Sequence, residues 1–216
     1  MNNRGKLIVV SGFSGAGKGT VLKCLMDKYD NYCLSVSATT RSPRVGEVDG
    51  REYFFKTVPE FEEMIEKGEL LEYAKYVNNY YGTPKTYVES KLENGSNVIL
   101  EIETVGALNI RKIFPESKLL FITPPSAKEL ESRLVGRGTE DGTAIMARLA
   151  KAAKESEGVE NYDYIVVNDT VEECADTINK LVCDDEVTSS DRRASNNIRL
   201  INKIREELKV YSEGDK

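Results

Sequence analysis

Short apolar runs and longer segments of helical spacing alternate along most of the chain. Four apolar runs are typical of strands buried in a sheet, at residues 6–10, 97–103, 118–125 and 162–169. Helical spacing is found at residues 18–29, 104–114, 126–134, 143–157 and 170–182. Because strands that alternate with helices usually form a parallel sheet covered on both faces, the pattern predicts an α/β fold.

Capping signals mark the ends of two predicted helices. Thr57 and Glu60 have the spacing of a capping box, and Gly68 is placed to end the helix that they begin. Ser126 and Glu129 form a second box. These signals set the first turns of both helices.

The last part of the chain differs from the rest. Residues 184–197 are polar and resemble a linker, and Ile201, Ile204, Leu208 and Tyr211 then share one helical stripe. Such a stripe either packs on the core or pairs with a second chain. We favour packing on the core, and the sequence leaves the oligomeric state open.

Composition excludes several kinds of function. The chain has 216 residues, a formal net charge of −6 and no histidine. The charge disfavours a general nucleic-acid partner, and the lack of histidine removes imidazole bases and the usual zinc sites. No apolar run approaches the roughly 18 residues that span a bilayer, so no membrane partner is expected. Four cysteines without C-x-x-C spacing are expected to be reduced thiols of a cytoplasmic protein.

The stretch "SGFSGAGKGT" (11–20) has the spacing of a phosphate-binding loop, with Gly12, Gly17 and Lys18 at its fixed positions. Glycines let several backbone N–H groups turn toward one anion, and the following helix adds its N-terminal dipole. The loop follows a predicted strand and opens a predicted helix, which is the context that this motif requires.

One position departs from the usual loop. Gly19 stands where a Ser or Thr hydroxyl normally contacts Mg²⁺, and Thr20 supplies a hydroxyl only one residue later. Glu101, near the end of a predicted strand, is a candidate to hold water bound to Mg²⁺. Thr20 and Glu101 are therefore the candidate metal residues.

A second phosphate site is expected around Arg41 and Arg44. Two guanidinium groups three residues apart suit a phosphate dianion, because each donates two parallel hydrogen bonds. Tyr53 and Tyr81 offer phenolic donors. The alternative for the arginine pair is a solvated basic turn.

Two acids, Glu72 and Glu103, are candidates for reading a purine base. Guanine presents N1–H and N2–H₂ donors that carboxylates accept, whereas adenine has no such pair, so acids in this role select guanine. Ser37 or Thr83 is a candidate donor to the guanine O6. The alternative for each acid is an ordinary exposed side chain at the end of a strand.

Three arginines, Arg133, Arg137 and Arg148, lie on two predicted helices joined by a glycine-bearing bend. Such a pair of helices is a candidate lid, and its arginines are candidates to neutralise charge on a moving phosphoryl group. The alternative is a set of ordinary surface arginines.

Taken together, these segments resemble the guanylate kinase family. The resemblance rests on "SGFSGAGKGT", "SVSATTRSPRVGEVDGREYFF", "LLEYAKYVNNYYGT", "VILEIETVGA", "LESRLVGRGTE" with "IMARLAKAAKE", and "YDYIVVND". They occur in family order and cover about residues 5–183.

The resemblance implies a P-loop kinase that transfers phosphate from ATP to GMP, with Mg²⁺. It assigns ATP to Gly12, Ser14, Gly15, Ala16, Gly17, Lys18, Gly19, Thr20, Arg133, Arg137, Asn168 and Asp169. It assigns GMP to Ser37, Arg41, Arg44, Glu47, Tyr53, Glu72, Tyr81, Thr83 and Glu103. Catalysis falls to Lys18, Arg41, Arg137 and Arg148.

The family implies three parts and leaves the tail outside them. The P-loop core is expected at residues 1–36, 97–125 and 158–183, an inserted α+β GMP-binding lobe at 37–96, a helical lid at 126–157, and a helical tail at 184–216. Besides Gly19, two positions depart from the family: Phe13 replaces proline or alanine, and Val105 replaces the common glutamine.

Two rival functions stay open at this point. One is a non-catalytic guanylate-kinase-like module that binds phosphopeptides, which the intact loop with Lys18 disfavours. The other is a kinase for a different phosphorylated acceptor, which the carboxylate argument for guanine disfavours.

Overall fold

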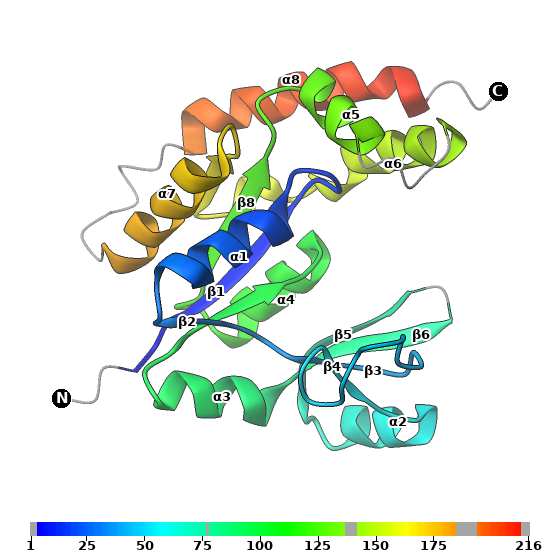
Figure 1. Ribbon diagram of the computed structural model, residues 1–216, viewed down its shortest axis with the longest axis vertical. Coiled ribbons are helices and arrows are strands. Elements are labelled where there is room, and N and C mark those ends of the chain that lie inside the picture. Colours follow the sequence, from blue (N-terminus) through cyan, green and yellow to red (C-terminus); the bar gives the residue numbers. More distant parts are fainter. Residues whose placement is uncertain (1–3, 77, 137–141, 185–193, 213–216) are drawn as a thin grey trace. The chain divides into compact units, whose positions relative to one another are not determined.

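The computed structural model describes residues 4–76, 78–136, 142–184 and 194–212 (Figure 1). The chain divides into two compact units. The first unit contains residues 1–9, 31–101 and 106–117, and the second contains residues 10–30, 102–105 and 118–216. Strand β1 (Leu7–Gly12) contributes its first three residues to the first unit and its last three to the second.

The first unit contains two groups of strands. After β1, its elements in chain order are β2 (Tyr32–Leu34), β3 (Ser37–Thr39), β4 (Tyr53–Phe55), α2 (Val58–Glu66), β5 (Leu70–Tyr76), β6 (Asn79–Pro84), α3 (Lys85–Glu93), β7 (Asn97–Glu101) and most of α4 (Thr104–Ile113). Strands β2 and β7 are parallel, with Tyr32 opposite Asn97, and β1 follows β7 in the strand order. Residues 98–100 of β7 are buried, as expected for a strand covered on both faces.

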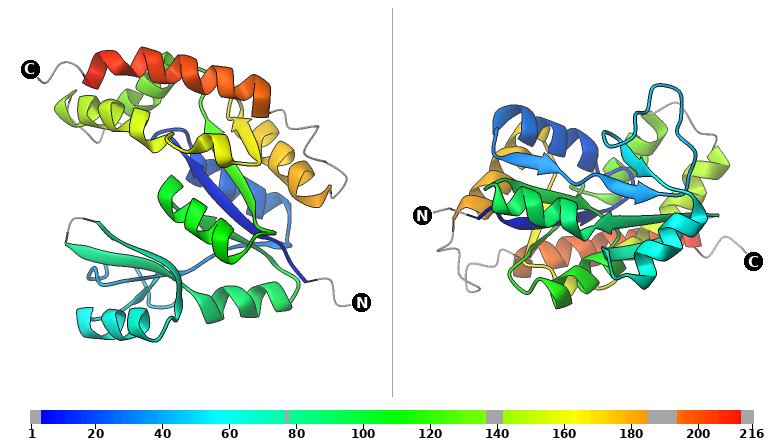
Figure 2. Two further views of the ribbon diagram at one scale, coloured as in Figure 1. Left: turned by 180° about the vertical axis from the view of Figure 1, so that it is seen from behind. Right: turned by 90° about the horizontal axis from the view of Figure 1, so that it is seen from below.

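The other four strands of this unit form a mixed sheet in the order β4-β3-β6-β5. Strand β3 pairs in parallel with β4, with Ser37 opposite Tyr53, and antiparallel with β6, with Thr39 opposite Tyr81. Helix α2 packs against this sheet (Figure 2). Its buried Phe61 stacks on Tyr80 with 5.2 Å between the ring centroids.

The second unit is built around the end of β1 and two further strands. Its elements are α1 (Lys18–Lys28), β8 (Lys118–Thr123), α5 (Ala127–Gly136), α6 (Gly142–Glu155), the 3₁₀ turn η1 (Val159–Asn161), β9 (Tyr164–Val167), α7 (Val171–Cys183) and α8 (Ala194–Ser212). Strands β8 and β9 are parallel, with Phe121 opposite Ile165, and the order is β1, β8, β9.

Aromatic rings pack in the core of the second unit. Phe13 meets Phe121 edge to face with 5.3 Å between ring centroids, and Phe121 meets Tyr162 at 5.8 Å. The Tyr162 hydroxyl donates to Ser11 Oγ at 2.7 Å, and burial raises the pKa of Tyr162 to about 12. This cluster supports the chain where β1 passes into the glycine-rich loop.

Helix α8 packs along α6 and also contacts α5 and β9 (Figure 1). Ile201, Ile204 and Leu208 are fully buried, and Tyr211 is half-buried. The apolar stripe therefore packs on the same chain, as the sequence favoured.

Both predicted capping boxes mark real helix ends. In α2, Thr57 Oγ1 accepts from Glu60 N, and the Glu60 carboxylate accepts from Thr57 N at 2.7 Å. At α5, Ser126 Oγ accepts from Glu129 N at 3.1 Å. These contacts satisfy N–H groups that the first turn of a helix leaves unpaired.

The predicted α/β class with a parallel sheet is confirmed. The strand expected at 97–103 ends at Glu101, where the chain becomes exposed, so Glu103 lies in the loop before α4. Among the described residues, no helix combines the length and the apolar character needed to cross a membrane. The division into core, lobe, lid and tail stays a prediction.

Candidate functional site

The glycine-rich loop lies between β1, which ends at Gly12, and α1, which begins at Lys18. Gly15 and Gly17 have φ values of 94° and 86°, in the left-handed region that favours glycine. A Cβ atom on Gly17 would lie 2.6 Å from Asn168 Nδ2, and one on Gly12 would lie 2.2 Å from the Ile122 carbonyl oxygen. Glycine is thus required at position 17 by its backbone conformation and by the nearby Asn168, and at position 12 by the nearby carbonyl of Ile122.

The Lys18 side chain folds back over this loop. Its Nζ donates to the Gly12 carbonyl at 2.9 Å and to the Phe13 carbonyl at 3.2 Å. Gly19 and Thr20 are exposed on the first turn of α1, and a Cβ atom on Gly19 would meet nothing within 4 Å. The first turn therefore has room for a side chain at position 19.

An internal anion contacts the loop. Glu155, the last residue of α6, accepts the Ser14 N–H through Oε2 at 2.7 Å. Arg148 Nη1 lies 3.3 Å from Ser14 Oγ, and Lys151 Nζ lies 3.9 Å from Glu155 Oε1. Helix α6 therefore places one acidic side chain, Glu155, and one basic side chain, Arg148, in contact with the loop.

Arg133 and Asn168 clamp the far side of the loop. The Ala16 carbonyl accepts from Asn168 Nδ2 at 2.7 Å and from Arg133 Nη1 at 3.3 Å. Arg133 also donates to the Asn168 carbonyl at 2.9 Å and to Glu129 at 2.8 Å. Arg133 thus holds the loop to the end of β9.

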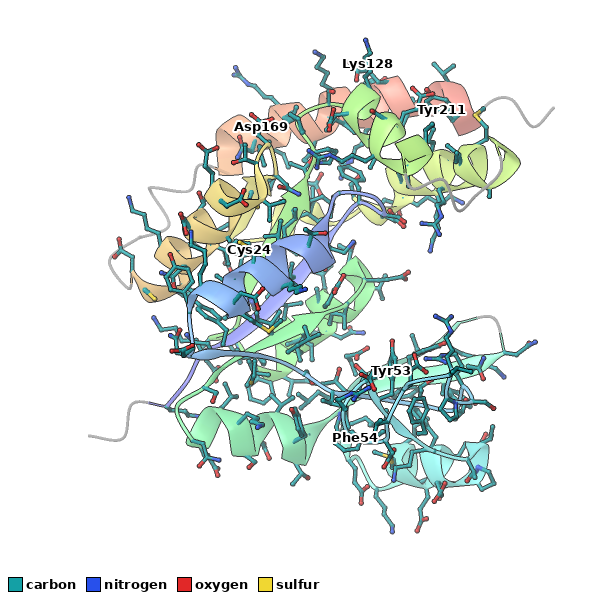
Figure 3. All side chains as sticks on the ribbon, viewed as in Figure 1. Cys24, Tyr53, Phe54, Lys128, Asp169 and Tyr211 are labelled. Carbon is teal, nitrogen blue, oxygen red and sulfur yellow. The ribbon has the colours of Figure 1, made fainter. Side chains whose placement is uncertain are left out.

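Two further residues were predicted to contact ATP, Asp169 and Arg137, and the structure describes the first of them. Asp169 follows Asn168 and is exposed beside the start of α7 (Figure 3). Arg137, expected to act in catalysis, lies outside the described residues. The described ATP candidates, from Gly12 through Asp169, all belong to the second unit.

In the first unit, four candidates lie on one face of the mixed sheet. Ser37 is opposite Tyr53, and Tyr81 is opposite Thr39, which is two residues from Ser37 on the same strand. Because side chains alternate between faces, Ser37, Tyr53, Tyr81 and Thr83 share a face. The Tyr53 and Tyr81 rings meet at 6.1 Å between centroids, and Figure 3 marks Tyr53 on β4.

Glu72 joins this face from β5. The Thr83 hydroxyl donates to Glu72 Oε1 at 2.6 Å. Burial raises the pKa of the Glu72 carboxyl, and the hydrogen bond from Thr83 lowers it in part. A half-buried carboxylate whose pKa is raised is a common feature of binding sites.

Arg41 is braced beside Tyr53. Its Nη2 donates to Glu47 Oε1 at 2.9 Å, and its guanidinium carbon lies 5.3 Å from the Tyr53 ring centroid. Glu47 Oε2 accepts the Arg44 backbone N–H at 2.7 Å. The hydrogen bond from Arg41, followed by that from Arg44, lowers the pKa of Glu47. Glu47 therefore orients Arg41, while the Arg44 side chain is exposed.

Glu101 and Glu103 fall in different units. Glu101 is exposed at the end of β7 in the first unit. Glu103 belongs to the second unit, where it forms an ion pair with Lys151 at 3.3 Å. The structure therefore gathers the GMP candidates within the first unit except for Glu103.

The departures at Phe13 and Val105 differ in environment. Phe13 is fully buried against Phe121, which accounts for its size. Val105 is 75% exposed, and nothing in the structure explains why valine stands at this position. Sequence reasoning missed Glu155: it lay on a predicted helix, but no spacing rule indicated that its carboxylate meets the loop.

Comparisons with known proteins agree with this geometry. The model of the guanylate kinase family matches residues 4–185. The guanylate kinase of Lactococcus lactis subsp. lactis is 52% identical over 182 residues, covering 84% of this chain and 89% of that protein. The guanylate kinase of Caldanaerobacter subterraneus subsp. tengcongensis is 46% identical over 207 residues, covering 96% of this chain and 98% of that protein.

A solved structure gives the same result. The crystal structure of guanylate kinase from Anaplasma phagocytophilum is 33% identical and superimposes with a TM-score of 0.65. The match covers 84% of this chain and 86% of that one. The chain therefore belongs to the guanylate kinase family.

Proposed function

We propose that this chain transfers the γ-phosphoryl group of ATP to GMP, giving ADP and GDP, and that it also accepts dGMP. Membership of the guanylate kinase family carries this proposal. The phosphate loop with Lys18 and the polar face around Glu72 supply groups that suit the two substrates.

The phosphate loop is the proposed donor site. Backbone N–H groups from Gly15 to Thr20, with the dipole of α1, suit the ATP phosphates. Lys18 is within reach of the outer phosphates once it leaves the two carbonyls that it contacts. Asn168 and Asp169 are proposed to lie beside the adenine ring.

Mg²⁺ is expected to accompany ATP. Thr20 and, through water, Glu101 are the proposed protein groups. Among the described residues no group of three or more His, Cys, Asp or Glu side chains is placed to hold a metal ion. The available donors fit an ion that phosphate oxygens and water hold for the most part, as is usual for Mg²⁺ in kinases. When bound, Mg²⁺ neutralises phosphate charge.

The mixed sheet is the proposed acceptor site. Glu72 accepts from the guanine N–H groups, with Glu103 as a second acceptor and Ser37 or Thr83 as donor to O6. Arg41, Arg44, Tyr53 and Tyr81 bind the GMP phosphate, and Glu47 orients Arg41. The face shared by these residues and the brace on Arg41 support this assignment.

In the transfer, an anionic phosphate oxygen of GMP attacks the γ-phosphorus of ATP. A new P–O bond forms, the bond from the γ-phosphorus to the bridging oxygen breaks, and ADP leaves with that electron pair. No general base is required, which fits a chain without histidine. Lys18, Arg41, Arg137 and Arg148 are proposed to offset the charge of the transition state.

An acceptor comparison tests the function. ADP release from ATP is measured with GMP, dGMP, AMP, UMP and CMP, for the wild type and for Glu72→Gln. We expect GMP to be the best acceptor and Glu72→Gln to lose most of that preference, because an amide presents N–H toward guanine N–H. Glu93→Gln, an exposed substitution in the same unit, serves as control. AMP as the best acceptor would contradict the proposal.

Other aspects follow from the same evidence. Relatives that are named guanylate kinases favour a kinase over a phosphopeptide-binding module. The cytoplasm is the proposed compartment, because all four cysteines are free thiols. No nucleic-acid partner is proposed for a chain with a net charge of −6.

A further inference from the structure

A carboxylate that the function does not use contacts the phosphate loop. Glu155 Oε2 accepts the Ser14 N–H at 2.7 Å, and the Glu155 side chain is only 15% exposed. A loop that binds phosphates gains nothing from a nearby negative charge through long-range electrostatics. The contact therefore has to be explained by what it does to the loop itself.

Glu155 is fixed by contacts to its own backbone and to the next residue, Ser156. Thr104 Oγ1 donates to the Glu155 carbonyl at 2.7 Å, and Thr104 is buried. Arg205 Nε donates to Ser156 Oγ at 2.8 Å, and Arg205 Nη2 donates to the Ser156 carbonyl. Arg205 is itself held by Glu160 at 2.7 Å. The carboxylate thus projects from an anchored backbone.

Arg205 comes from helix α8, between the buried residues Ile204 and Leu208. The family model ends at residue 185, so α8 lies beyond the part of the chain that it matches. A helix outside that part therefore contacts the residue that follows Glu155 through two hydrogen bonds.

We propose that Glu155 is a positioning residue that sets the Ser14 amide, and with it the first turn of the phosphate loop, before ATP binds, and that Arg205 of α8 keeps Glu155 in place. A loop fixed in its binding conformation loses less freedom when the ligand arrives, so ATP binds more tightly. This inference rests on the proposed function for the identity of the nucleotide.

The test compares four variants and one control variant by direct binding of ATP, with turnover measured in parallel. Glu155→Ala removes the acceptor, and Glu155→Asp keeps the charge but withdraws it by one methylene. We expect both to raise the Kd for ATP about tenfold, the factor that follows from losing one hydrogen bond to a charged group. Glu155→Gln keeps an acceptor oxygen and is expected to stay within about threefold of the wild type.

Arg205→Gln tests the support from α8 and is expected to weaken ATP binding about threefold. Lys203→Gln on the same helix is the matched control, because Lys203 is exposed and forms a surface ion pair with Glu207. In every variant the Kd for GMP should stay unchanged. Thermal melting identifies any variant that fails to fold, in which case Glu155→Asp and Glu155→Gln still decide the matter.

Two results would overturn the inference. Wild-type ATP binding by Glu155→Asp and Glu155→Ala would show that the contact sets nothing. Tighter ATP binding by Glu155→Gln than by the wild type would identify the carboxylate as a competitor of phosphate. A wild-type protein that binds ATP but does not phosphorylate GMP would instead contradict the proposed function, while the binding series would still test this inference.

Discussion

At the scale of single residues, glycines in the same loop have different reasons to be there. Gly17 combines a positive φ of 86° with the Asn168 amide 2.6 Å from where a Cβ atom would lie. Gly19 has open space around it. The sequence motif makes the two look alike, and only the neighbours separate them.

This difference predicts opposite outcomes for two substitutions. Gly17→Ala should lower stability by about 1–3 kcal/mol, because it forces a strained backbone and displaces Asn168. Gly19→Ser should raise stability by about 0.5 kcal/mol, because serine is a better helix residue than glycine. Chemical denaturation measures both. A stable Gly17→Ala protein with unchanged ATP binding would contradict the account of the loop.

Glu72 predicts how GMP binding depends on pH. Burial raises its pKa above the ordinary value of 4.5, so the carboxylate takes up a proton at a higher pH than an exposed glutamate does. A protonated carboxyl is a poorer acceptor for guanine N–H groups. The KM for GMP should therefore rise as pH falls through this raised pKa, while the KM for ATP stays level.

The control for this pH profile is Glu72→Gln, which cannot titrate. Its KM for GMP should already be high at neutral pH and should not rise further at the same pH values. An identical acid limb in both proteins would assign the titration to another group.

At the scale of elements, one carboxylate organises the turn between β3 and β4. Glu47 binds the Arg41 guanidinium through one oxygen and the Arg44 backbone N–H through the other. The turn also closes on itself, because the Glu47 N–H donates to the Arg44 carbonyl at 3.0 Å. The element presents Arg41 in one orientation.

Glu47→Gln should therefore raise the KM for GMP about tenfold, since one charge-assisted hydrogen bond is lost. Glu52→Gln in the same segment is the matched control, because Glu52 also contacts an arginine, Arg51, and a backbone N–H, that of Val48. Initial-rate kinetics at saturating ATP give both values. Equal effects of the two substitutions would remove the special role of Glu47.

Helix α8 is held by its buried face. Ile204 is fully buried, whereas Val210 on the same helix is 75% exposed. Ile204→Ala should lower the free energy of unfolding by about 2–4 kcal/mol, because it leaves a cavity, while Val210→Ala should change it little. Urea unfolding measures both. Similar values for the two would mean that α8 does not pack in solution as described.

Local signals in the sequence predicted helices and loops better than they predicted contacts between distant residues. The capping box at Thr57 and Glu60 and the loop before Lys18 are encoded within a few residues, and the structure has both features. The contact between Ser14 and Glu155 joins residues 141 positions apart. No periodicity or motif carries information about such a pair, because it depends on how α6 packs.

At the scale of the whole molecule, alternating strands and helices were enough to predict the α/β class. The fold class did not predict which candidate residues lie together on one face of a sheet. Register in the mixed sheet places Ser37, Tyr53, Tyr81 and Thr83 on one face. Register depends on turns and pairing partners, so the sequence identified these residues without showing that they share a face.

The two-unit organisation has a kinetic consequence. The loop with Lys18 belongs to the second unit, and the face with Glu72 and Arg41 belongs to the first, while Glu103 is the GMP candidate that belongs to the second unit. The contacts described for Lys18 lie within the second unit, and those described for Arg41 and Glu72 lie within the first. Addition of the two nucleotides should thus be random rather than compulsory, because each site can bind its nucleotide first. Equilibrium binding of GMP without ATP and of ATP without GMP measures this, and failure of either nucleotide to bind alone would contradict it.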